Sequence, residues 1–146
     1  MKIRLEPVTV ASRAAVERLE TAPGQEGFVE SVAECLAEAD RRPVGVYDGD
    51  ALIGFAMYGF FWEYLPFGRL WLDRLLIDRR FQGRGYGRAA LAALLERLER
   101  EYHKKRIYLS VVEANRPAAA LYESFGFRFT GERDTHGERV MCLRTR

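Results

Sequence analysis

The fold of this chain is decided by residues 80–88, which read Arg-Phe-Gln-Gly-Arg-Gly-Tyr-Gly-Arg. Glycine has no Cβ atom, so three glycines at alternate positions let the backbone turn tightly and bring its N–H groups close to a ligand. The apolar run of residues 70–77 before this loop predicts a strand, and the Ala- and Leu-rich run after it predicts a helix. A helix N-terminus directs free N–H groups and the positive end of its dipole at such a loop. Strand, glycine loop and helix in this order predict a phosphate-binding site.

Two familiar phosphate-binding motifs do not describe this loop. The Walker loop needs a Lys-Ser or Lys-Thr pair at the start of its helix, and the dinucleotide fingerprint needs G-x-G-x-x-G followed by an acidic residue on the next strand. The pattern that fits is Gln82-x-x-Gly85-x-Gly87. A glycine-rich turn is often only a turn, but the position of this one between a strand and a helix favours a ligand site.

Length and composition limit the classes of protein to which this chain can belong. Residues 1–146 are expected to form a single domain, because a chain of this length buries about two thirds of its extended surface in one core. Two separated cysteines and two isolated histidines give no metal-ligand spacing, so no metal is expected. There is neither a secretory signal nor an apolar run of roughly 18 residues that would span a membrane. These features predict a cytoplasmic protein without a membrane partner.

Charge is divided unevenly along the chain. Residues 1–63 hold six Lys or Arg against eleven Asp or Glu, whereas residues 64–146 hold seventeen against ten. The basic half suits a polyphosphate ligand and the acidic half suits a cationic one, although a solvated surface has the same pattern. The basic residues alternate with Glu rather than cluster with aromatic residues, which does not favour nucleic acid as a partner.

Hydrophobic spacing and turn residues predict the other elements. A helix from Thr9–Ser12 to about Glu20 turns Val10, Val16 and Leu19 inward. The remaining elements are expected as strands at 3–8 and 106–112, helices at 25–39, 86–102 and 116–125, and hairpins at 43–58 and 127–143. The strand, helix and strand between residues 70 and 112 imply a right-handed parallel crossover.

Acidic and aromatic side chains gather in the first half of the chain. Four glutamates recur on one face of the predicted helix 25–39, namely Glu26, Glu30, Glu34 and Glu38. Like charges at this spacing repel by about a few tenths of a kcal/mol per pair, which a cationic ligand or basic neighbours would relieve. A solvated helix face is the alternative. The aromatic stretch 60–68, which includes Trp62 and Glu63, either walls a substrate pocket or caps the core or a dimer interface.

A second motif occupies residues 115–127, which read Asn-Arg-Pro-Ala-Ala-Ala-Leu-Tyr-Glu-Ser-Phe-Gly-Phe. It resembles the N-x-x-A-x-x-L-Y-x-x-x-G-F helix of the GNAT superfamily of N-acetyltransferases, and the glycine loop resembles the acetyl-CoA loop of the same superfamily. The two motifs stand in the family's order, and the likeness covers essentially the whole chain. The resemblance implies an α+β fold, with a central mixed, partly splayed sheet of about six to seven strands flanked by about four helices.

The same resemblance implies acetyl-CoA as the co-substrate, held in the cleft between the fourth and fifth strands. The strand backbone would pair with the acetyl and pantetheine groups, the loop amides would bind the pyrophosphate, and Asn115 would contact the pantetheine arm. The implied cofactor-binding residues are Leu75, Leu76, Ile77, Gln82, Gly83, Arg84, Gly85, Tyr86, Gly87, Arg88 and Asn115.

Direct transfer from a thioester needs a neutral amine and a proton for the leaving thiolate. The resemblance makes Tyr122 that acid, and a tyrosine pKa of about 10 lies near a thiol pKa of about 8.5 to 9. A core tyrosine packing the short helix is the alternative for this residue. Asp73, set with Arg74 inside an apolar strand, is the candidate base through water, or else half of an internal ion pair. The other candidate bases are Glu63 and the glutamates Glu26, Glu30 and Glu34.

Several segments resemble bacterial diamine and spermine/spermidine acetyltransferases: residues 46–50, 54–59, 74–78 and 140–143. They imply a small-molecule amine as acceptor, a polyamine or diamine, bound by Glu26, Glu30, Glu34, Trp62 and Glu63. An aminoglycoside, a protein N-terminus or lysine, and a non-catalytic CoA-binding sensor stay open as alternatives. A homodimer is common in the family.

Overall fold

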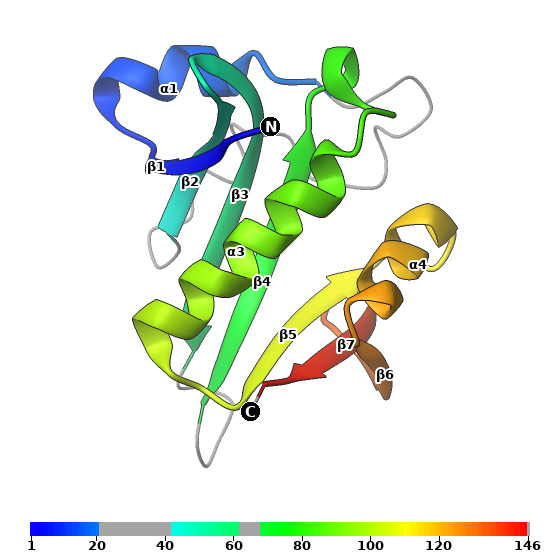
Figure 1. The fold of residues 1–146 in the computed structure, drawn as a ribbon. Helices are drawn as coiled ribbons and strands as arrows, with labels where there is room; N and C mark the ends of the chain where they lie inside the picture. Colours follow the sequence, from blue (N-terminus) through cyan, green and yellow to red (C-terminus); the bar gives the residue numbers. More distant parts are fainter. Residues whose placement is uncertain (21–41, 62–67, 146) are drawn as a thin grey trace.

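The computed structural model describes residues 1–20, 42–61 and 68–145 (Figure 1). Its strands are β1 (Ile3–Pro7), β2 (Arg42–Asp48), β3 (Ala51–Phe61), β4 (Arg69–Ile77), β5 (Arg106–Val111), β6 (Arg128–Arg133) and β7 (Arg139–Arg144). Its helices are α1 (Val10–Glu17), α3 (Tyr86–Tyr102) and α4 (Arg116–Ser124), and a short 3-10 helix, η1 (Arg79–Phe81), follows β4. No helix in these ranges is long and apolar enough to cross a membrane. The helix predicted over residues 25–39 lies outside the described residues.

Seven strands form one mixed sheet in the order β1-β2-β3-β4-β5-β7-β6. β4 and β5 run parallel, with α3 as the crossover between them, and the other neighbouring strands are antiparallel. The pairing of β4 with β5 is limited to Leu70 with Ile107 and Trp71 with Tyr108. Beyond these residues the two strands diverge into a V, which is plain in Figure 1. The predicted mixed and partly splayed sheet is therefore confirmed.

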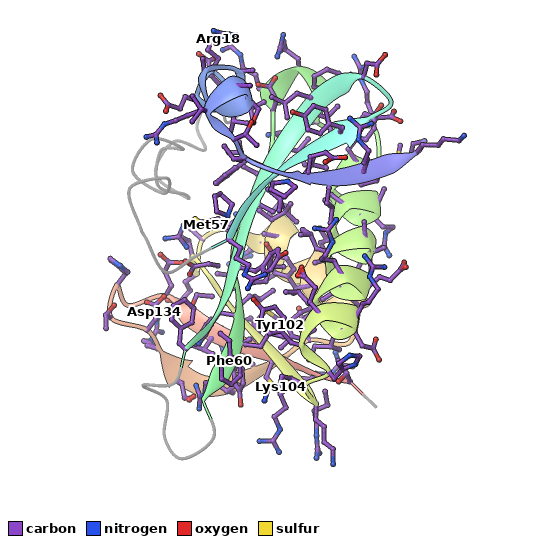
Figure 2. All side chains as sticks on the ribbon, turned by 90° about the vertical axis from the view of Figure 1, so that its left-hand side faces the viewer. Arg18, Met57, Phe60, Tyr102, Lys104 and Asp134 are labelled. Carbon is purple, nitrogen blue, oxygen red and sulfur yellow. The ribbon has the colours of Figure 1, made fainter. Side chains whose placement is uncertain are left out.

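Aromatic side chains hold the closed end of this V. Tyr102, the last residue of α3, stacks on Phe60 with ring centroids 6.4 Å apart, and the Lys104 ammonium lies 4.7 Å from the Phe60 ring (Figure 2). Tyr58 meets Tyr102 edge-on at 6.2 Å and donates its hydroxyl hydrogen to Glu101 at 2.8 Å. These contacts attach the C-terminal end of α3 to the sheet where β4 and β5 pair. The split between β4 and β5 therefore opens at the other end of these two strands.

The main core lies between α3 and the sheet face that this helix crosses. Leu91, Leu94 and Leu98 of α3 are fully buried, and they share one apolar cluster with Leu70 and Leu109 of the sheet. Each buried leucine of this kind stabilises the fold by about 1.5–3 kcal/mol. The core therefore fixes α3, and with it the glycine loop at its N-terminus, against the sheet.

In the first helix, one of the three residues predicted to face inward is exposed instead. Val16 and Leu19 are buried as expected, but Val10 is 97% exposed, so its predicted inward position is wrong. Val10 and Val16 are six residues apart, about 240° around a helix of 3.6 residues per turn, and cannot share a face. The predicted cap is present, because Thr9 and Ser12 exchange side-chain and backbone hydrogen bonds.

Candidate active site

A cavity of about 270 Å³ lies at the open end of the V, between the end of β4, the glycine loop and α4. Its lining joins three separate stretches of the sequence: Leu75, Leu76, Ile77, Phe81, Gln82, Gly83, Gly85, Tyr86, Gly87, Asn115, Pro117, Ala118, Leu121 and Tyr122. Residues of both sequence motifs therefore line one cavity.

Glycine stands at positions 83, 85 and 87 of the loop for different structural reasons. Gly83 and Gly85 adopt φ values of +77° and +85°, a left-handed conformation that side chains rarely take. Gly85 is the N-cap of α3 and supplies no side-chain hydrogen bond to the first turn, so the amides of that turn stay available to a ligand. At Gly87 an added Cβ would meet only an ordinary 3.7 Å contact with Leu121. The fold itself thus requires glycine at 83 and 85, whereas at 87 the small residue keeps the cavity side of the helix open.

A buried carboxylate anchors the start of the loop. Asp78 is 2% exposed and accepts hydrogen bonds from the backbone and side-chain nitrogens of Arg80, at 3.0 and 2.8 Å, and from the backbone of Glu20 at 3.1 Å. Burial raises the pKa of Asp78, but these hydrogen bonds outweigh it, so the pKa is lowered overall. Sequence reasoning missed this role, although an Asp at a strand end before two arginines is a recognisable cap.

The other end of the loop is held from the first half of the chain. Tyr86 donates its hydroxyl hydrogen to Asp48 at 2.5 Å, and the backbone N–H of Lys2 donates to the same carboxylate at 2.9 Å. The hydrogen bond from Tyr86 lowers the pKa of Asp48, and in turn raises the pKa of Tyr86. Asp48 is the last residue of β2, next to the turn into β3, so this contact joins the sheet to the start of α3.

The backbone N–H and C=O groups along one edge of β4 face the open split. The N–H of Asp78 donates to a β3 carbonyl at 2.8 Å. Backbone groups of successive strand residues point to opposite edges, so Leu76 also faces β3, whereas Leu75 and Ile77 face the split. Gln82 donates its side-chain N–H to the Ile77 carbonyl at 2.9 Å. An extended ligand therefore finds strand groups of Leu75 and the N–H of Ile77 along the split.

Tyr122 is carried into the split by the short helix α4. Asn115 caps this helix, because its side-chain oxygen accepts from the N–H of Ala118 at 3.3 Å, and a proline occupies the first turn. The Tyr122 ring packs edge-on against Phe127 with centroids 5.9 Å apart. Burial raises the pKa of Tyr122 to about 12, although the positive charge of Arg74 acts in the opposite direction. The hydroxyl is therefore protonated throughout the physiological range.

A second cavity, of about 80 Å³, lies deeper in the V, between β4, β5 and the start of β7. It is lined by Leu72, Asp73, Arg74, Leu75, Leu109, Ser110, Val111, Val112, Asn115, Ala118, Tyr122 and Glu138. Asp73 is the extra residue of a β-bulge, since Leu72 and Arg74 pair with consecutive residues of β3. Leu75, Asn115, Ala118 and Tyr122 line both cavities, so the two spaces adjoin beside these four residues.

Comparisons with known proteins decide the family of this fold and site. Residues 11–127 match the model of the acetyltransferase (GNAT) family. The chain belongs to this family. Spermine/spermidine N(1)-acetyltransferase of Bacillus subtilis (strain 168) is 46% identical over 148 positions, which cover 97% of each chain.

Two solved structures share the fold of this GNAT chain at lower sequence identity. An acetyltransferase from Thermus thermophilus is 22% identical with a TM-score of 0.77, and the match covers 99% of this chain and 98% of that one. An aminoglycoside acetyltransferase in complex with coenzyme A is 20% identical with a TM-score of 0.81, covering 98% and 95% of the two chains. These two structures show that the GNAT fold extends over nearly all of this chain.

The predicted site residues separate into three groups in this structure. Those of the cofactor set line the first cavity except Arg84 and Arg88. Arg84 lies over the Phe81 ring, 5.7 Å from its centroid, and Arg88 donates to Ser124 of α4 at 2.7 Å. Asp73 lines the second cavity. The predicted acceptor residues lie outside the described residues: Glu26, Glu30, Glu34, Trp62 and Glu63.

Proposed function

We propose that this acetyltransferase moves the acetyl group of acetyl-CoA directly to a primary amine of a polyamine or diamine. The observation that carries the proposal is that the two cavities adjoin beside residues that include Tyr122. One space is bounded by a phosphate-type loop and the other by a carboxylate, so donor and acceptor can approach one another through the split. The 46% identity to a protein named as a spermine/spermidine acetyltransferase supports the polyamine as acceptor.

Acetyl-CoA fits the first cavity by its chemistry. Its pyrophosphate would lie at the amides of residues 83–88, where the glycine conformations and the uncapped helix start favour an anion. The pantetheine amides would pair with the backbone of Leu75 and Ile77, and the Asn115 amide nitrogen would donate to the same arm. This arrangement would leave the thioester beside Tyr122, one of the residues that line both cavities.

The acceptor amine would occupy the second cavity and attack the acetyl carbonyl carbon. A cationic amine must first lose a proton, which Asp73 would accept through water before the solvent takes it. As the new C–N bond forms and the C–S bond breaks, Tyr122 would donate its hydroxyl proton to the sulfur. Coenzyme A then leaves as a thiol, and the phenolate takes a proton from solvent. The products are the N-acetylated amine and the free thiol.

Release of the coenzyme A thiol from acetyl-CoA, followed with a thiol reagent, tests the proposal. The amines to compare are spermidine, spermine, 1,4-diaminobutane, an aminoglycoside and a peptide with an N-terminal alanine. The expected result is fast release with the polyamines and slow release with the peptide. Preference for the aminoglycoside or the peptide would overturn the acceptor assignment, and no release with any amine would favour a CoA-binding sensor.

Asp73→Asn tests the base, because it removes the carboxylate while keeping the size of the side chain. The expected loss in kcat is about 10²-fold or more, as for other general bases, with the KM for acetyl-CoA unchanged. Full activity of this variant would show that the base lies elsewhere.

A further inference from the structure

The second cavity carries a carboxylate that the transfer reaction does not use. Glu138 lines this cavity together with Asp73, yet the two residues come from different parts of the sheet. We propose that Glu138 binds a second ammonium group of the acceptor and so selects amines that carry two or more charges. The inference rests on the proposed function and names the residue that gives it specificity.

Sheet register brings the two carboxylates to the same space. Asp73 is the bulged residue of β4, and Glu138 directly precedes β7. Arg139 pairs with Val111 of β5, so Glu138 stands opposite Val112, at the open end of β5. Because β5 lies between β4 and β7, the two carboxylates that line the cavity come from segments on either side of β5. With Asp73 as the proposed base at the reacting amine, Glu138 is the second carboxylate of this cavity that a further ammonium group of the acceptor could reach.

The turn before β7 is held through the backbone of Glu138. The Asp134 N–H donates to the Glu138 carbonyl at 2.9 Å, and the Asp134 carboxylate accepts from the Glu138 N–H at 2.9 Å. A glutamine at this position keeps these backbone contacts and nearly the same volume. The charge of residue 138 can thus be removed while the turn and the cavity wall are retained.

The charges around the cavity favour a cation. Its lining includes two carboxylates, Asp73 and Glu138, and one guanidinium, that of Arg74. Arg74 donates to the backbone carbonyl of Asp73 at 2.8 Å, and its charge acts on Tyr122. Among the described lining residues, the formal charge is therefore net negative with Glu138 and neutral without it. One carboxylate is enough for a monoamine, so the second affects only acceptors with a further positive charge.

The test is the steady-state selectivity of Glu138→Gln for spermidine over butylamine, an amine with a single charge. The KM for spermidine is expected to rise about tenfold, in the range of one charge-assisted hydrogen bond at a partly exposed site. The kcat/KM for butylamine, the kcat for spermidine and the KM for acetyl-CoA are expected to stay within about twofold. Glu138→Asp, which retains the charge, is expected to recover part of the selectivity.

Glu113→Gln is the matched control. Glu113 is an exposed carboxylate after the end of β5 that pairs with Arg133 at 3.4 Å and lines neither cavity. An unchanged selectivity in Glu138→Gln, or an equal loss in Glu113→Gln, would overturn the inference while the proposed function stands. Failure of the wild-type protein to use any amine would overturn both.

Discussion

Replacing Tyr122 by phenylalanine removes the one side-chain hydroxyl that, among the described residues, lines both cavities. The ring and its edge-on contact with Phe127 remain, so the fold and acetyl-CoA binding are expected to be unchanged. A general acid of this kind contributes about 10²–10⁴-fold to the rate, which is about 3–5 kcal/mol of the barrier. We therefore expect kcat to fall by at least about 10²-fold, with the KM for acetyl-CoA unaltered.

The raised pKa of Tyr122 also predicts how the wild-type kcat depends on pH. Because burial raises this pKa to about 12, only about one molecule in 10⁴ carries the phenolate at pH 8. Wild-type kcat should then show no decline from Tyr122 ionisation between pH 7 and pH 10, whereas an unperturbed tyrosine with a pKa of about 10 would begin to lose its proton there.

Both parts are measured by thiol release with spermidine across this pH range, and calorimetry with coenzyme A checks that Tyr122→Phe still binds it. Turnover within about twofold of wild type would remove Tyr122 from the mechanism. A loss of coenzyme A affinity equal to the loss of kcat would instead assign the residue to binding.

Four further substitutions test the loop, its anchors and the core. Gly85→Val should abolish coenzyme A binding in calorimetry, because a β-branched residue avoids a φ of +85° and the loop would have to change its backbone conformation; normal affinity would refute the phosphate site. Asp48→Asn should raise the KM for acetyl-CoA severalfold at constant kcat by weakening the hold on Tyr86, and an unchanged KM would contradict this. Asp78→Asn should lower the free energy of unfolding by about 1–3 kcal/mol in urea titrations. The pKa of Asp78 is lowered in the folded protein. The stabilisation by its carboxylate is therefore complete above the unfolded pKa of about 3.9 and is lost as pH falls through the folded pKa. Equal acid sensitivity of wild type and variant would argue against this role of Asp78. Leu94→Ala, at a fully buried site, should cost about 2–5 kcal/mol by the same titration, and a smaller loss would mean that the core closes around the gap.

The local features of this site followed from the sequence because their causes are local. Alternate glycines between a strand and a helix predicted a tight turn, and in the structure Gly83 and Gly85 make it with left-handed backbone. Asn115 caps α4 because a short side-chain acceptor stands three residues before a free amide. Val10 shows the limit of such reasoning, since an apolar residue near a helix start carries no information on which face the helix buries.

Contacts between distant segments could not be derived in this way. Tyr86 and Asp48 are 38 residues apart and meet only because the end of β2 lies beside the start of α3. Glu138 reaches the cavity of Asp73 only because β7 pairs with β5 on the side away from β4. Nothing in the residue spacing specifies this strand order.

The sequence by itself therefore determined the phosphate-type loop, the capped helix of Tyr122 and, through their likeness to a family, the reaction class. Backbone torsion and helix capping depend on residues a few positions apart, so they can be predicted directly from the sequence. The tertiary structure decided that the two motifs line one cavity, that burial raises the pKa of Tyr122, and that a second carboxylate, Glu138, lines the same cavity as Asp73. Burial and charge proximity depend on which strands become neighbours, and that is a property of the folded sheet.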